Sequence, residues 1–120
     1  MTRARPHSAI VVVPAHNEAA SVIRCLGSAI NAAQHALRCG ALDEVHVILV
    51  AHRCDDDTYE RACRVRARRR GRQPTLDVLR LQDEVDVGAV RSTGVRAGLS
   101  KLGSPLDRTW IFSTNRKSVV

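Results

Sequence analysis

Short apolar runs rich in β-branched residues recur along the chain and alternate with longer segments of helical periodicity. A parallel strand that is buried on both faces has a nearly continuous apolar sequence, so such runs predict strands of a parallel sheet. The predicted strands cover residues 8–13, 45–50, 76–81 and 109–113.

The first interval between strands predicts a helix over residues 19–38. Apolar residues such as Val22, Leu26 and Ile30 recur there at three or four positions, and Gly40 marks the end. A second helix is predicted from the three aspartates at residues 55–57, whose charges suit a helix N-terminus, to about residue 70.

A third helix is predicted over residues 87–102. Its interior contains Gly94 and Gly98, which lower helix propensity, and Gly103 follows its end. Strands that alternate with helices indicate right-handed crossover connections between parallel strands. The predicted fold class is therefore α/β, with an open, mainly parallel sheet of Rossmann-like type.

The length of 120 residues is typical of one domain, so residues 1–120 are expected to form a single unit. Tyr59, Trp110 and Phe112 are the only aromatic residues, and the core must therefore be built from Ala, Val, Leu and Ile. Seventeen of the nineteen basic residues are Arg, and the net charge is +7. This charge favours anionic partners, including nucleotides, sugar phosphates and an anionic membrane surface.

The four cysteines form no C-x-x-C pair and are expected to be reduced thiols. The apolar run near the N-terminus ends at Pro14, which makes it too short for a signal-peptide core or a membrane span. The expected location is cytoplasmic, with attachment to a membrane surface as an alternative.

Polar loops follow three of the predicted strands, at residues 16–18, 52–58 and 113–118. The carboxyl ends of parallel strands meet at one edge of the sheet, where open α/β folds bind ligands. Pro14 has no N–H to donate, so the first strand is expected to end there. Asn17 is expected to cap the next helix, leaving His16 and Glu18 facing a ligand crevice. The alternative is that these loops are solvated turns.

These loops resemble motifs of the family 2 glycosyltransferases, which have the GT-A fold. The string Pro-Ala-His-Asn-Glu at residues 14–18 is similar to the first nucleotide-binding loop of that family. Residues 50–58 are similar to its second-strand segment, where Asp56 and Thr58 match while Ala51 and His52 replace the usual aspartates. Residues 87–94 are similar to the segment that opens its third helix.

The resemblance implies transfer of a sugar from a nucleotide diphosphate sugar to an acceptor, with the donor as the main partner. It also implies a binding site made of Pro14, Ala15, His16, Asn17, Glu18, His52, Asp56, Gly88 and Arg91. The loop at residues 14–18 would hold base and ribose. Gly88 would allow close approach of the backbone, and Arg91 would contact the diphosphate.

The end of the chain departs from the family. The strand at residues 109–113 resembles the one that leads into the Asp-x-Asp motif, which binds a divalent metal, but Asn115-Arg116-Lys117 stands in its place. Hard cations prefer carboxylate oxygens, so no metal or other cofactor is expected here. The resemblance covers only the nucleotide-binding half of the family's domain. We therefore expect an incomplete domain. The sequence identifies no catalytic residue, and we do not expect the chain to turn over a substrate.

Two other functions stay open. The chain could be an inactive nucleotide-binding module, or a basic interaction protein that uses the arginine-rich run at residues 64–72. A nucleic-acid partner is disfavoured because this run has no aromatic residue on which bases could stack. The sequence leaves the oligomeric state open.

Overall fold

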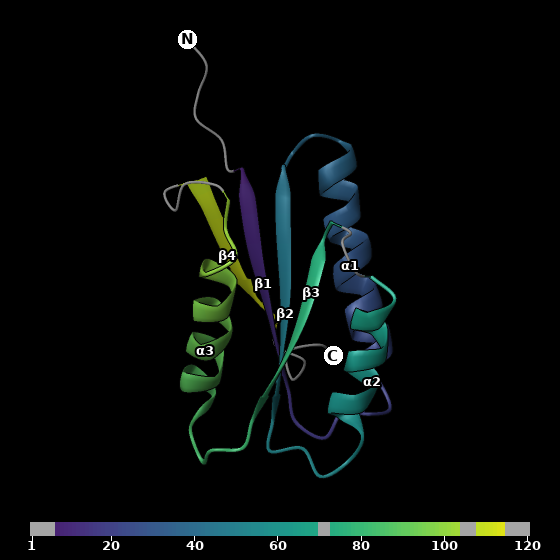
Figure 1. Ribbon diagram of the computed structural model, residues 1–120, viewed down its shortest axis with the longest axis vertical. Helices are drawn as coiled ribbons and strands as arrows, with labels where there is room; N and C mark the ends of the chain where they lie inside the picture. The colour runs from purple at the N-terminus through teal and green to yellow at the C-terminus, as the bar shows by residue number, and fades with distance from the viewer. Residues whose placement is uncertain (1–6, 70–72, 104–107, 115–120) are drawn as a thin grey trace.

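The computed structural model describes residues 7–69, 73–103 and 108–114, and Figure 1 shows their arrangement. The strands in this part of the chain are β1 (Ser8–Ala15), β2 (Glu44–His52), β3 (Thr75–Leu81) and β4 (Thr109–Ser113). The helices are α1 (Val22–Arg38), α2 (Thr58–Ala67) and α3 (Val87–Leu99).

The strands form one open, all-parallel sheet in the order β3-β2-β1-β4. In its register, Ile10 lies beside His46 on one side and beside Ile111 on the other. The predicted α/β class with a parallel sheet and alternating helices is therefore confirmed. This strand order is also the one that begins Rossmann-like folds.

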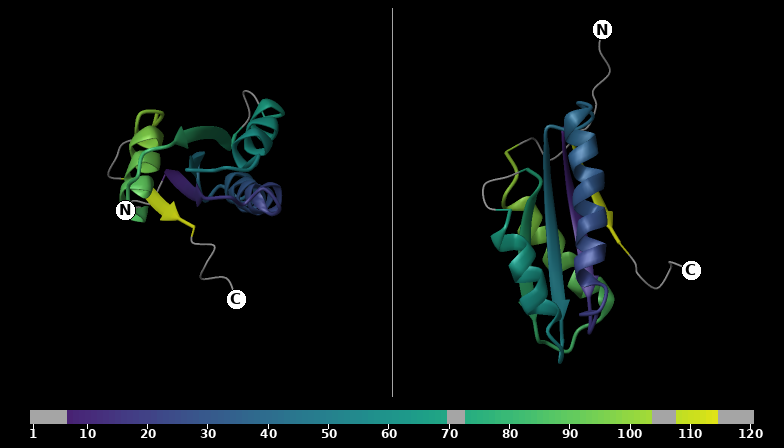
Figure 2. Two further views of the ribbon diagram at one scale, coloured as in Figure 1. Left: turned by 90° about the horizontal axis from the view of Figure 1, so that it is seen from below. Right: turned by 90° about the vertical axis from the view of Figure 1, so that its right-hand side faces the viewer.

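Helices cover both faces of the sheet. The views in Figure 1 and Figure 2 place α1 and α2 on one face and α3 on the other. The α1/α2 face has a core that includes Val13, Leu26 and Leu49, whereas the α3 face packs Val12 and Val90. Because β2 is covered from both sides, its residues 45–51 are all buried, which explains why they are apolar except for His46, whose two ring nitrogens are hydrogen-bonded to Thr75 and Glu44. No helix of the described ranges is long and apolar enough to cross a membrane.

Strand β1 continues past the point where the sequence predicted its end. Pro14 lies beside Val50, and Ala15 lies beside Ala51. The Val12 carbonyl accepts from the Thr114 amide, so the backbone of Val12, and of Pro14 two residues later, is directed toward β4. The pairing of β1 with β4 ends at Val12. No backbone hydrogen bond to β4 therefore requires the N–H that Pro14 lacks. The prediction that Pro14 stops the strand was wrong.

The helices are shorter than predicted at one end each. The Glu18 carbonyl accepts from the amides of Ser21 and Val22, which makes a turn ahead of α1. Helix α1 therefore begins at Val22 rather than at residue 19. Helix α2 ends at Ala67 and α3 at Leu99, each followed by a turn.

Two glycines set how closely α3 approaches the sheet. Both Gly94 and Gly98 are buried on the helix face that contacts β1. A Cβ atom added at Gly94 would lie 2.5 Å from Val12 Cγ1, and one added at Gly98 would collide with Ile10. These residues therefore allow close packing of α3, beyond their effect on helix propensity.

Candidate functional site

Three loops are joined by hydrogen bonds at the carboxyl edge of the sheet, at the lower end of Figure 1. His16 Nδ1 lies 2.8 Å from the His52 carbonyl, and His52 Nε2 lies 3.0 Å from the Asp83 carbonyl. Because carbonyls only accept, both imidazole nitrogens act as donors. The amide of Arg53 donates to the Leu81 carbonyl. The loops after β1, β2 and β3 thus form one connected surface.

The side chain of Asn17 holds the second of these loops. Its Oδ1 accepts from the amides of Asp55, at 2.7 Å, and Asp56, at 3.3 Å. Its backbone has a φ of 51°, a left-handed conformation that Asn tolerates better than most residues. The prediction that Asn17 caps α1 was wrong, since its oxygen is used between loops and α1 begins five residues later.

Asp56 ties the same two loops together from the other side. Its Oδ2 accepts from the Ala19 amide at 3.1 Å, and its Oδ1 accepts from both the amide and the hydroxyl of Thr58. The buried Thr58 Oγ1 also accepts from the Glu18 amide at 2.8 Å. The Thr58 hydroxyl, followed by the Thr58 and Ala19 amides, lowers the pKa of Asp56 below its usual 3.8.

We expect Asp56 to make the stability of the protein depend on acid pH. A carboxylate with a lowered pKa in the folded state stabilises that state above its unfolded pKa and loses the effect as pH falls through the folded pKa. Asp56→Asn should therefore lower the Tm at about pH 5 to 7 and cost progressively less below pH 3.8. Thermal unfolding followed by circular dichroism across this range measures the difference.

Two variants of Thr58 control this experiment. Thr58→Ser keeps the hydroxyl donor and should keep the pH dependence, whereas Thr58→Val should remove most of it. A Tm difference between wild type and Asp56→Asn that is the same at every pH would contradict the role given to the Asp56 charge.

A polar cavity of about 320 Å³ opens on this surface. It is lined by His16, Arg53, Asp55 and Gln82, one or two residues from each loop. Arg53 has a φ of 50°, and its guanidinium lies 3.7 Å from the Glu84 carboxylate. Left-handed backbone at non-glycine residues costs about 1 kcal/mol or more and concentrates at functional sites. The volume is at the lower end of the range for small-molecule sites.

Arg91 marks a second part of the edge, where the strand order reverses between β1 and β4. It lies in the second turn of α3, and its Nε donates to Ser113 Oγ at 2.9 Å. Ser113 pairs with Val12 at the end of the β1–β4 register. Open α/β sheets bind ligands at such a switch point.

The α3 N-terminus beside Arg91 is capped by Asp86, whose Oδ1 accepts from the Ala89 amide at 2.8 Å. A Cβ atom added at Gly88 would meet Asp86 Oδ1 at an ordinary 3.4 Å. Packing within the chain therefore does not require glycine at position 88, and Gly88 is exposed.

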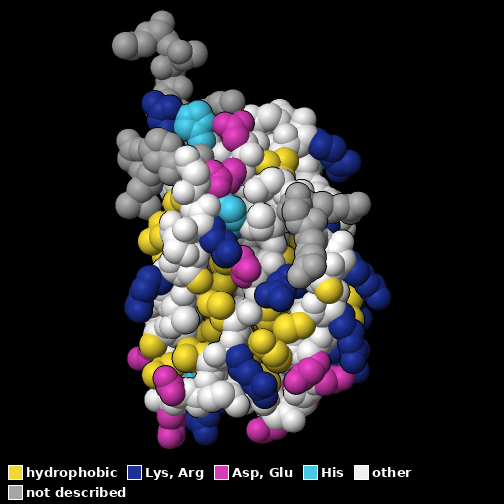
Figure 3. Space-filling view, viewed as in Figure 1, with side chains coloured by type: hydrophobic (Ala, Val, Ile, Leu, Met, Phe, Trp, Pro, Cys, Tyr) yellow, Lys and Arg dark blue, Asp and Glu magenta, His cyan; other side chains and the backbone are white. Residues whose placement is uncertain are grey.

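The charges at this edge are mixed. Acidic side chains gather at the lower end of the face in Figure 3, and the exposed acids of the three loops are Asp55, Asp56, Asp57, Asp83, Glu84 and Asp86. Arg61 is paired with Asp57 at 3.0 Å. An anionic ligand here would depend on local contacts with Arg53 and Arg91, because the surrounding acids oppose it.

The predicted site residues fall into three groups. His16, Asn17, Glu18 and Asp56 lie in the joined loops, next to His52 at the end of β2, whereas Gly88 and Arg91 lie at the α3 N-terminal end. Pro14 and Ala15 belong to β1, and the Ala15 side chain is buried in the core.

The polar loops predicted from the sequence to form the crevice include Arg53 and Ser113, with no contact assigned to either, and they do not include Gln82. Arg53 and Gln82 directly follow the last residues of β2 and β3, which are paired in the sheet, and this position is the signal that could have identified them. Residues 115–117, which replace the metal motif, lie outside the described residues.

The described side chains offer no metal centre: within residues 7–69, 73–103 and 108–114, no group of three or more His, Cys, Asp or Glu could hold an ion. No protein-family model, curated protein or solved structure matches this chain.

Proposed function

We propose that this chain is a nucleotide-sugar-binding domain of GT-A type, related to the family 2 glycosyltransferases. The observation that carries the proposal is Arg91, which is positioned by Ser113 at the switch point of the sheet. The three joined loops lie along the same carboxyl edge. A nucleotide diphosphate sugar would lie across this edge, with its base and its phosphates at different places.

The cavity beside β2 suits the base and ribose. The Asp55 carboxylate can accept from ribose hydroxyls, as acidic residues do in other nucleotide-binding folds. His16 and Arg53 present flat, polar groups that can stack on a base or donate to it. The residue 14–18 loop forms one wall, held in place through Asn17 and Asp56.

The diphosphate end would be recognised by Arg91. Because its Nε is bonded to Ser113, the guanidinium is oriented and its terminal nitrogens can donate to phosphate oxygens. The exposed Gly88 presents no side chain beside it, so the ligand can approach the backbone. Positive partial charge at the α3 N-terminus adds attraction, which the Asp86 carboxylate opposes.

Binding rather than sugar transfer is the expected activity of this chain. Departure of a nucleotide diphosphate develops negative charge that a metal normally stabilises. The chain has Asn115 and Lys117 where the family has metal-binding acids, and an amide offers one neutral oxygen while an ammonium repels a cation. The donor set therefore does not fit the divalent metal that the family uses.

We predict that nucleotide diphosphate binding does not depend on a divalent metal. Calorimetric titration with Mn²⁺, with Mg²⁺ and with EDTA should give dissociation constants that agree within about threefold, less than 1 kcal/mol. A large gain in affinity on adding metal would contradict the proposal and would indicate a site that uses the loop aspartates.

A second candidate function is binding to an anionic surface through α2. Arg64 and Arg66 on this helix are exposed, as is Arg68 directly after its end. Such contacts would weaken steeply as salt screens them, and each exposed arginine would contribute little alone. The experiment on Arg91 in the Discussion separates this candidate from the first.

A further inference from the structure

Strand β4 exposes an unusual amount of apolar side chain. Trp110 is 55% exposed, Ile111 48% and Phe112 45%. Within the described residues, β4 is at the edge of the sheet and pairs with β1 alone. Three consecutive large apolar residues on an open edge mark a surface for association.

The opposite edge of the sheet, strand β3, differs from β4 because charged side chains protect it from pairing with another strand. Strand β3 carries Asp77, whose carboxylate is 3.0 Å from Lys101, and Arg80, which lies over the Tyr59 ring at 5.1 Å. Charged side chains on an edge strand oppose pairing with another strand. Strand β4 has no charged residue.

The backbone of β4 is ready to pair at this edge. The Thr114 amide donates to the Val12 carbonyl, so the backbone groups of Phe112 and Trp110, at alternate positions, also point toward β1. The N–H and C=O groups of Ile111 and Ser113, which lie between these positions, therefore point away from β1.

We propose that β4 pairs antiparallel with β4 of a second copy of this chain, around a two-fold axis at Ile111. In this register Thr109 is opposite Ser113 of the second copy, and Trp110 is opposite its Phe112. Residues of the same type are then opposite each other, a hydroxyl residue opposite a hydroxyl residue and an aromatic residue opposite an aromatic residue, because the order of side-chain types in β4 is the same in both directions. A two-fold interface requires such self-complementarity.

The hydrogen bonds agree with this register. In an antiparallel pair, residues that exchange both backbone bonds alternate with residues that exchange none. Ile111, whose backbone groups point away from β1, would exchange both bonds with Ile111 of the second copy. Trp110 and Phe112 would form the unbonded pairs, in which side chains come closer and aromatic contacts stabilise most.

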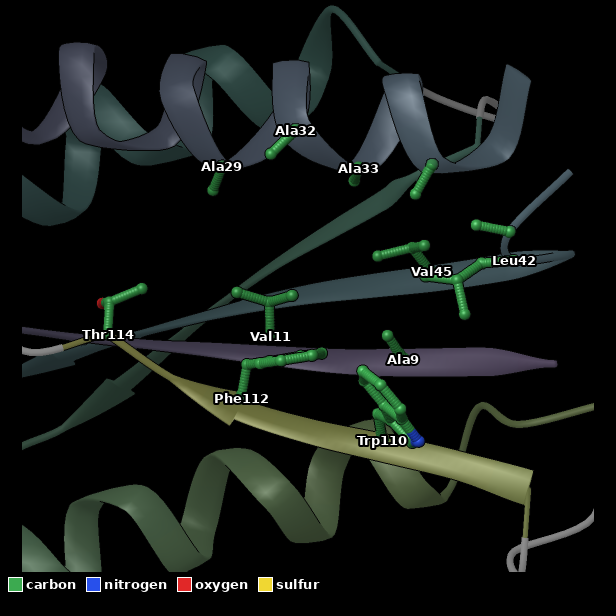
Figure 4. A pocket seen from close by; sticks show the side chains of 12 residues that line it. Ala9, Val11, Ala29, Ala32, Ala33, Leu42, Val45, Trp110, Phe112 and Thr114 are labelled. Carbon is green, nitrogen blue, oxygen red and sulfur yellow. The ribbon is translucent and has the colours of Figure 1, made fainter. Parts of the chain in front are cut away.

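The pairing would also gather aromatic side chains beside an apolar groove. Figure 4 shows Trp110 and Phe112 facing the groove of about 690 Å³ between β4 and α1. Its far wall is made of small residues of α1, namely Ala29, Ala32, Ala33 and Ala36. Two copies would place four rings on this face. Each copy has a net charge of +7, but β4 has no charged residue, so its side chains put no like charges at the two-fold axis.

Sedimentation equilibrium of the full chain tests the proposal. The wild type should be a concentration-dependent dimer. Ile111→Lys places two ammonium groups opposite each other and should weaken dimerisation at least tenfold. Ile23→Lys is the matched control, because Ile23 is 52% exposed on α1, and it should leave the dimer intact.

Trp110 reports on the same interface without any variant, since it is the only tryptophan. Its emission should shift to shorter wavelength, and iodide should quench it less, as the wild type dimerises. A monomer at all concentrations, or a dimer with fully quenched tryptophan, would overturn the proposal.

A mixing experiment distinguishes pairing of the β4 strands from nonspecific hydrophobic association. Ile111→Lys and Ile111→Glu should each be monomeric alone and should form a mixed dimer when combined, because opposite charges then face each other. Dimers that persist in Ile111→Lys, or failure of the mixture to associate, would place the interface elsewhere or leave β4 to a different partner.

Discussion

Replacing Arg91 with alanine should weaken binding of a nucleoside diphosphate about ten- to a hundredfold. A hydrogen bond to a charged group contributes about 1.5–3 kcal/mol, which corresponds to this loss of affinity. Arg91 is half-buried and oriented by Ser113, so its contact with phosphate should be at least as strong as an average one. Calorimetric titration at fixed ionic strength measures the change.

Two controls make this prediction specific. Arg96→Ala removes an exposed arginine from the last turn of the same helix and should leave binding unchanged. A nucleoside without phosphates should bind Arg91→Ala as well as it binds the wild type, because the arginine contacts only the diphosphate.

The double variant Arg64→Ala, Arg68→Ala tests the basic-surface alternative. Both side chains are exposed, Arg64 on α2 and Arg68 directly after it, and their removal should barely affect nucleotide binding. They are a better choice than Arg69, which donates to the carbonyls of Gln73 and Pro74. If the double variant abolishes binding and Arg91→Ala does not, the anion site lies on α2 and the nucleotide-sugar proposal fails.

The strands could be predicted from the sequence because burial dictates their composition. Strand β2 is covered on both faces, so its buried residues are apolar except for His46, and the prediction lies within two residues of its observed bounds. The start of α1 could not be predicted in the same way. Asn17 has the residue type of a helix cap, but its oxygen bonds amides 38 and 39 positions away, a contact that local sequence does not reveal.

The candidate site was predictable as a location but not as a set of contacts. Parallel strands bring their carboxyl ends together, which correctly placed His16 and His52 at one edge. The cavity, however, depends on Arg53 and Gln82, which became neighbours through the pairing of β2 with β3. Their side-chain types do not distinguish these two residues from other polar residues of a loop; only their positions directly after two paired strands do.

At Gly94, tertiary packing outweighs the effect of glycine on helix propensity. Within a helix, glycine is unfavourable relative to alanine by about 1 kcal/mol, which is why the sequence predicted a weakened third helix. In the structure Gly94 is buried against Val12, and its missing side chain is what lets α3 cover β1. The close contact between α3 and the sheet stabilises the fold by more than the lower helix propensity costs.

Gly94→Ala should therefore lower the free energy of unfolding by about 1–3 kcal/mol, the usual cost of forcing extra volume into a packed core. The added Cβ would lie 2.5 Å from Val12 Cγ1, and a buried valine has little rotamer freedom to move away. Gly27→Ala is the matched control. Gly27 lies inside α1 with no atom within 4 Å of an added Cβ, so the same substitution should stabilise the protein by about 0.5–1 kcal/mol. Urea denaturation of the two variants measures both changes, and a stabilising effect at Gly94 as well would mean that α3 does not pack on β1 this closely.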